Sequence, residues 1–115
     1  MLRLVVEHAD SWNAAWFGDV SETEPRVAPL RDAMAAAGRD PESLEMTMGV
    51  NVVFPELAGE ADEIPAHALS GSPSEIARGL QGYADAGVGH VIAACVPSTA
   101  AAMGALAQAV SLARS

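Results

Sequence analysis

The feature that most constrains this chain is the alternation of strand-like runs with longer helical segments. Strands are expected at residues 9–13, 45–54 and 89–95, and helices at residues 1–8, 21–38, 72–87 and from 97 onward. Residues 49–54 are almost continuously apolar, which is typical of a strand covered on both faces. This alternation predicts a parallel sheet built with right-handed crossovers and with the helices outside it.

Local signals mark where two of the helices begin and which faces they bury. Ser21 and Glu24 fit a capping box, in which a hydroxyl and a carboxylate each bond a free backbone amide. Ser72 and Glu75 fit a second box, with Pro73 at the first helical position. Helical spacing predicts buried faces at Val27, Leu30, Met34 and Ala37, at Ile76, Leu80 and Tyr83, and at Met103, Leu106 and Val110.

The helical segment at residues 1–8 carries no such start signal, so we expect the chain to enter a larger fold midway. Three strands alone would also leave two apolar sheet edges unpaired. The expected fold is therefore α/β, with about three βα units and parallel strands forming a single domain over residues 1–115. We interpret it as part of a (β/α)8 (TIM) barrel rather than as a small open sheet.

Charge and hydropathy exclude several classes of function. Six basic and fifteen acidic residues give a net charge of −9, which repels nucleic acid and anionic membrane surfaces. No run of about 18 strongly apolar residues is present for a membrane span. Cys95 is the only cysteine and lies in an apolar run, so we expect a buried thiol and a soluble, cytoplasmic protein.

The segment between the second and third strands is expected to be a long acidic loop. Residues 55–70 contain two prolines, one glycine and four acidic residues, with a helical turn expected near residues 66–69. Such a loop could be a lid over a site or a solvated connection. The three histidines, at positions 8, 67 and 90, share no metal-ligand spacing, so no metal site is predicted.

Four short stretches carry a resemblance to a known family. They read EHADSWN at residues 7–13, AGRDP at 37–41, LSGSPSEIA at 69–77 and AGVGHV at 86–91. In order and spacing they resemble the C-terminal third of luciferase-like monooxygenases, the flavin- or F420-dependent barrel oxidoreductases. Ser11 stands where that family often has glycine.

The resemblance implies that the three strands are numbers six, seven and eight of the barrel. It implies F420 or FMN as cofactor and a site at the carboxyl ends of the strands. Trp12 and Asn13 are expected to end the first strand, with Asn51 near the end of the second. The family's N-terminal strands carry most of the cofactor pocket and the acid–base residues. No catalytic residue is therefore assigned, and the chain is expected to be inactive alone.

The candidate cofactor-binding residues are Trp12, Asn13, Asn51 and Ser72, and most of them have a structural alternative. Trp12 could stack on a flavin-type ring or pack under a helix. Asn13 could bond a ligand or cap a turn. Ser72 could help hold an anion at a helix N-terminus or act only as a cap.

Two functions remain open on the sequence alone. The first is the C-terminal part of a luciferase-like oxidoreductase that requires its N-terminal half. The second is a free-standing partial barrel, a non-catalytic binding or assembly module that forms homo-oligomers through its open strand edges.

Overall fold

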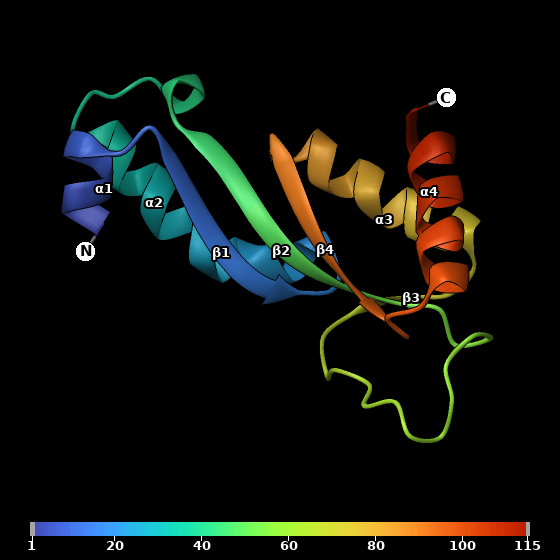
Figure 1. Ribbon diagram of the computed structural model, residues 1–115. Coiled ribbons are helices and arrows are strands. Elements are labelled where there is room, and N and C mark those ends of the chain that lie inside the picture. The colour runs from blue at the N-terminus through green and yellow to red at the C-terminus, as the bar shows by residue number, and fades with distance from the viewer. Residues whose placement is uncertain (1, 115) are drawn as a thin grey trace.

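The alternation of strands and helices is confirmed by the computed structural model, which describes residues 2–114 (Figure 1). Met1, part of the first expected helix, lies outside the described residues. The elements are α1 (Leu2–His8), β1 (Ser11–Phe17), η1 (Val20–Thr23), α2 (Glu24–Ala36), η2 (Pro41–Ser43), β2 (Glu45–Val53), β3 (Leu69–Ser70), α3 (Pro73–Asp85), β4 (His90–Val96) and α4 (Ala100–Arg114). The helical turn expected at residues 66–69 is wrong, because Leu69 and Ser70 form the short strand β3 instead.

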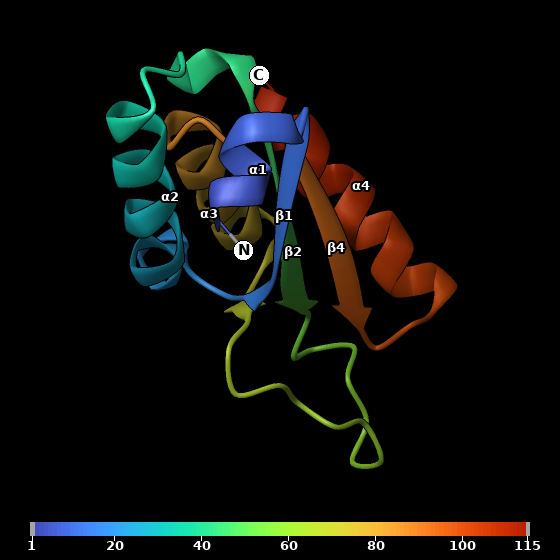
Figure 2. The same cartoon turned by 90° about the vertical axis from the view of Figure 1, so that its left-hand side faces the viewer.

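The sheet is parallel throughout, and β2 is its central strand. On one side β2 pairs with β1 from Glu45 to Val50, and then with β3 at Val52 and Val53. On the other side it pairs with β4 along its length. The three long strands therefore lie side by side in the order in which the chain forms them, and residues 54–68 extend beyond their carboxyl ends (Figure 2).

The hydrophobic core fills the space between one face of this sheet and the helices. Its largest cluster joins Met48, Val50 and Val52 of β2 to buried residues of α2, α3 and α4. A second cluster joins α1, α2 and Leu44, the residue just before β2, around Leu30. The expectation that β2 is covered on both faces is met only in part within residues 2–114. The helices of these clusters pack on one face, while on the other face Gly49 and Val53 are buried and Thr47 and Asn51 are half-buried.

The predicted helical faces are confirmed in α2 and α3 for most positions. Val27, Leu30, Met34, Ile76 and Tyr83 are buried. The predictions were wrong for Ala37, which is exposed in the cap of α2, and for Met103, which is 46% exposed on α4. Leu80, Leu106 and Val110 are half-buried. In α4 the fully buried positions are the alanines at 102 and 109, because small side chains let this helix approach α3 closely.

The two expected capping boxes have different outcomes. At α3 the box is confirmed, since Ser72 Oγ accepts from the Glu75 amide and the Glu75 carboxylate accepts from the Ser72 amide. At α2 the prediction was wrong. A 3₁₀ turn precedes this helix, capped by Asp19. Thr23 stands at the N-cap of α2, but its side chain makes no capping bond. Glu22 instead reaches back to the Gly18 amide at 2.9 Å.

Arg39 supplies the C-terminal cap of α1 from a distant part of the chain. Its guanidinium donates to the carbonyls of Val5, Val6 and Ala9 at 3.2, 2.8 and 2.7 Å. It also donates to the carbonyl and hydroxyl oxygens of Ser43 at 3.2 and 2.9 Å. The fork of an arginine satisfies carbonyls that the end of a helix leaves free. The AGRDP stretch therefore fastens α1 to the turn that precedes β2.

Candidate functional site

The candidate site lies on the sheet face opposite the helices, which we call the open face. Because side chains alternate along a strand, burial of Met48 and Val50 in the core directs Thr47, Gly49 and Asn51 to the other side. The pairing register brings neighbours from β1 and β4 to the same face. The members of the open face used below are Asn13, Trp16, Thr47, Gly49, Asn51, His90, Ile92 and Ala94.

A polar row crosses the open face near the start of the strands. Asn13 pairs in register with Thr47, and Thr47 pairs with His90. The Asn13 side-chain amide donates to the Thr47 hydroxyl at 2.8 Å, and that hydroxyl donates to the Trp12 carbonyl at 3.3 Å. This chain of bonds fixes the side chain of Asn13, which is exposed.

An apolar row follows, centred on Gly49. A Cβ placed on Gly49 would lie 2.8 Å from the ring atoms Cε3 and Cζ3 of Trp16. Absence of a side chain at Gly49 therefore lets the indole lie close to the sheet. Ile92 pairs with Gly49 from the other side. Trp16 is 51% exposed and Ile92 is 47% exposed, so the row offers an apolar surface to a ligand or a partner.

The first strand ends later than the sequence suggests, and this moves its site residues. β1 continues to Phe17, with an irregularity between Ala14 and Phe17 that lets both of these residues face the core. Trp12 and Asn13 consequently lie in the first half of the strand, and the expectation that they end it was wrong. Trp16, which the sequence analysis missed, lies near the carboxyl end.

The structure does not bring the four predicted residues together. Trp12 packs against both hydrophobic clusters, on the covered face. Asn13 and Asn51 share the open face, but Asn51 lies four residues beyond the partner of Asn13, about 13 Å along the strand. The Asn51 side-chain amide donates to the His67 carbonyl at 2.9 Å.

Ser72 is occupied by its own helix. Its hydroxyl is engaged by the Glu75 amide, and the Glu75 carboxylate stands at the same helix N-terminus. A negative charge at this position complements the helix dipole from within the chain. An anionic group could bind there only by displacing Glu75.

Beside the carboxyl ends of the strands, a network of polar groups surrounds Gly18. The buried Tyr83 hydroxyl donates to the Gly18 carbonyl at 2.7 Å, and Glu22 accepts from the Gly18 amide. Burial, with a smaller contribution from the Glu22 and Asp19 charges, raises the pKa of Tyr83, which stays a neutral donor. Burial raises the pKa of Glu22, but hydrogen bonds from His67 and from the Gly18 and Asp19 backbone outweigh burial and lower that pKa overall.

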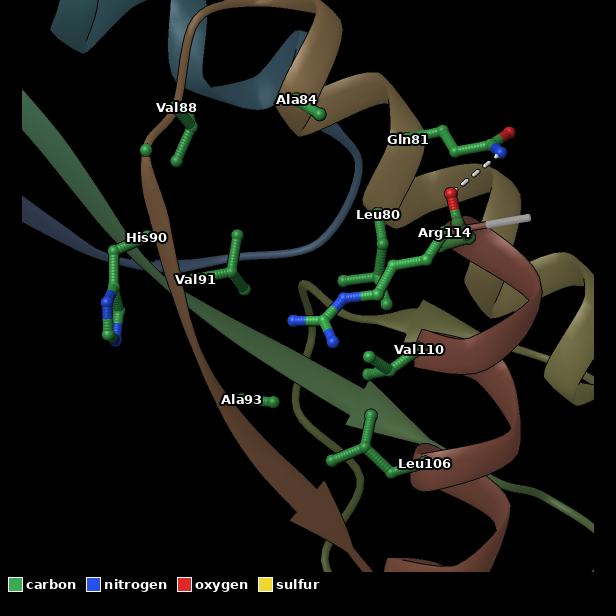
Figure 3. Close-up of a pocket in the computed structure, with 12 residues that line it drawn as sticks. Leu80, Gln81, Ala84, Val88, His90, Val91, Ala93, Leu106, Val110 and Arg114 are labelled. Carbon is green, nitrogen blue, oxygen red and sulfur yellow. Dashed lines mark hydrogen bonds between the residues drawn. The ribbon is translucent and has the colours of Figure 1, made fainter.

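A separate groove of about 560 Å³ lies on the covered side, between β4, α3 and α4. Figure 3 shows Val91, Leu106 and Val110 facing this space together with the guanidinium of Arg114, while His90 turns away from it. The groove exists because α4 packs mainly on α3, where Gln81 donates to the Ala113 carbonyl at 3.2 Å.

Cys95, half-buried against the core, has a pKa raised by burial, which keeps its thiol protonated and weakly nucleophilic.

Within residues 2–114, no group of three histidine, cysteine, aspartate or glutamate side chains is arranged to hold a metal ion. In the same described range, no helix has the length and apolar character needed to cross a membrane. No protein-family model matches the sequence, and no curated protein matches it.

Proposed function

We propose that this chain is the C-terminal part of a luciferase-like, flavin- or F420-dependent oxidoreductase, a monooxygenase-type (β/α)8 barrel. In this proposal β1, β2 and β4 are the last three barrel strands, and the open face lines the barrel interior. The observation that carries the proposal is the open face itself, where an exposed indole lies over a glycine on adjacent parallel strands. The four sequence stretches that resemble the family support it.

The residues of the open face suit one wall of a site for a planar ring. Trp16 offers an aromatic surface for stacking, and Ile92 extends that surface across β2. Asn13 and Thr47 supply hydrogen-bonding groups at one side of it, and Asn51 supplies an amide at the other. Trp16 takes the stacking position that the sequence analysis gave to Trp12, because Trp12 packs on the covered face.

The cofactor, FMN or F420, supplies the hydride or activated oxygen when it is bound. This chain contributes positioning and exclusion of water, since its open face holds no acid–base pair. Activity is expected to require the N-terminal barrel strands. A cytoplasmic location belongs to the same proposal, because the single cysteine is free and half-buried.

The test is a titration of FMN and of F420 into the purified chain, followed by tryptophan fluorescence and by the absorbance of the cofactor. Binding that is lost in Trp16→Leu and kept in the matched variant Trp12→Phe supports the proposal. Binding that is unchanged in Trp16→Leu would overturn the assignment of the open face as a cofactor wall.

A second candidate function is a non-catalytic, homo-oligomeric partial barrel. Within the described residues, no strand pairs with the outer edge of β1 or of β4, and the apolar groove lies beside the β4 edge. Light scattering distinguishes the two. A cofactor-free dimer that becomes a monomer in Ile92→Lys supports the assembly module, and a cofactor-free monomer of the wild-type chain rejects it.

A further inference from the structure

The connection between β2 and β3, residues 54–68, is fastened at its return end to the turn that follows β1. We call this connection the β2–β3 loop. Its His67 Nδ1 bonds the Glu22 carboxylate of η1, and the His67 carbonyl accepts from Asn51 of β2. Immediately after these contacts, β3 pairs with Val52 and Val53. His67 thus fixes where the loop returns to the sheet.

The same end of the loop is also held by a close approach between the backbones of Gly18 and Ala68. A Cβ on Gly18 would lie 2.5 Å from the Ala68 amide nitrogen and 2.8 Å from its carbonyl carbon. Only a glycine at position 18 allows this crossing. The Gly18 amide and carbonyl are in turn held by Glu22 and Tyr83. One carboxylate, Glu22, therefore bonds both of the segments that cross, through the Gly18 amide and the His67 ring.

Among the contacts that hold the return end of the β2–β3 loop, the His67–Glu22 contact is the one that responds to pH, because of the charges in the loop. The loop carries four acidic residues and no lysine or arginine, so His67 is its only group that can become positive. His67 contacts the Glu22 carboxylate of η1 and, through its carbonyl, the neutral Asn51 amide of β2. The charged and titratable groups of the same network are the Asp19 carboxylate, which caps η1, and the Tyr83 hydroxyl of α3, which bonds the Gly18 carbonyl. The two α2 cations have other partners: Arg26 lies over the Phe17 ring at 5.9 Å, and Arg31 lies 3.7 Å from the Glu24 carboxylate.

We propose that His67 and Glu22 form a proton-strengthened clasp that holds the β2–β3 loop at the carboxyl ends of the strands. When the His67 ring is protonated the contact joins an imidazolium to a carboxylate, and when the ring is neutral only a neutral hydrogen bond remains. Glu22 stays ionised in both cases. The contacts of Asn51 and Gly18 do not change charge, so they keep the loop seated while the clasp sets how tightly it is held.

This clasp does not depend on the cofactor proposed above, because all of its contacts lie within the chain. Its consequence for any ligand at the carboxyl ends of the strands is a loop that is held more firmly at pH 5.5 than at pH 8.5. The pair is partly exposed, with 66% of the His67 side chain and 32% of the Glu22 side chain accessible, so the effect is a modest one.

The test is hydrogen exchange of the full chain at pH 5.5 and 8.5, expressed as protection factors so that the intrinsic pH dependence of exchange is removed. Two amides report on the two sides of the clasp: Gly18, which bonds Glu22, and Gly71, which bonds the Val53 carbonyl just after β3. For the wild-type chain we expect protection of both amides to be about two- to fivefold higher at pH 5.5.

Matched variants separate the clasp from a general effect of pH on the fold. His67→Gln retains a hydrogen-bonding side chain without the charge and is expected to abolish the difference between the two pH values, as is Glu22→Gln. His90→Gln removes an exposed histidine outside the clasp and is expected to keep the wild-type difference. Equal protection at both pH values in the wild type, or a wild-type difference retained in His67→Gln, would overturn the proposal.

Discussion

Replacement of Arg39 tests whether a single side chain holds α1 to the rest of the molecule. Of its five hydrogen bonds, those to the Val6 and Ala9 carbonyls are the shortest, at 2.8 and 2.7 Å, and both are partly buried. A hydrogen bond to a charged group contributes about 1.5 kcal/mol at the lower end of its usual range, so these two together contribute about 3 kcal/mol. The remaining three are longer or exposed, and water replaces them at little cost.

Arg39→Ala is therefore expected to lower the free energy of unfolding by about 3 kcal/mol, and Tm by about 12 °C for a chain of this size. Arg39→Lys keeps the charge but not the planar fork, so it is expected to recover less than half of the loss. The assay is urea unfolding followed by circular dichroism, with hydrogen exchange of α1 to show that this helix loosens first.

Arg31→Ala is the matched control for loss of an arginine. Arg31 is exposed, 3.7 Å from the Glu24 carboxylate and 3.3 Å from the Ala86 carbonyl, and its removal is expected to cost less than about 0.5 kcal/mol. A loss below about 1 kcal/mol in Arg39→Ala, or one no larger than in Arg31→Ala, would refute the view that Arg39 holds the end of α1.

Three further substitutions test the core, the open face and the acid stability of the fold. Tyr83→Phe leaves the buried Gly18 carbonyl without its 2.7 Å partner and should cost about 1–2 kcal/mol in urea unfolding; a cost below 0.5 kcal/mol would contradict this account. Gly49→Ala should cost about 1–3 kcal/mol and change tryptophan emission, because the new Cβ would lie 2.7 Å from the Ala15 Cβ and 2.8 Å from the Trp16 ring. Gly104→Ala, in open space on α4, should not destabilise. Because the pKa of Glu22 is lowered in the folded state, its ionised carboxylate stabilises the fold at neutral pH, and this stabilisation is lost as pH falls through that pKa. Glu22→Gln should therefore flatten the acid limb of a plot of stability against pH. An unchanged acid limb would contradict this role of Glu22.

The elements of the fold were predictable where their signals are local. The Ser72–Glu75 box, the apolar spacing of Ile76 and Tyr83 and the Val-rich run of β2 all lie within a few residues of the structure they specify. The alternation of strands and helices then limits the topology to a parallel sheet. These features agree with the structure because a helix cap or an amphipathic face depends mainly on near neighbours in the chain.

The candidate site was less predictable. Polar Asn13 looked like the end of a strand, but its amide bonds Thr47 across the sheet, and β1 continues to Phe17. The irregularity in β1 then reverses the simple alternation, so Trp16 reaches the open face while Phe17 enters the core. A one-residue shift of register exchanges the two faces of a strand. The local sequence of β1 contains no pattern that reveals this shift.

By itself, the amino-acid sequence specified an α/β chain with parallel strands, the approximate position of each α-helix and most of the buried faces of α2 and α3. Tertiary contacts selected which tryptophan is exposed, which arginine caps α1 and which carboxylate holds His67. Those contacts join residues that are far apart in the chain, such as Glu22 and His67 or Arg39 and Ala9. Their formation depends on sheet register and helix packing, which arise only when distant segments bury their apolar surfaces together.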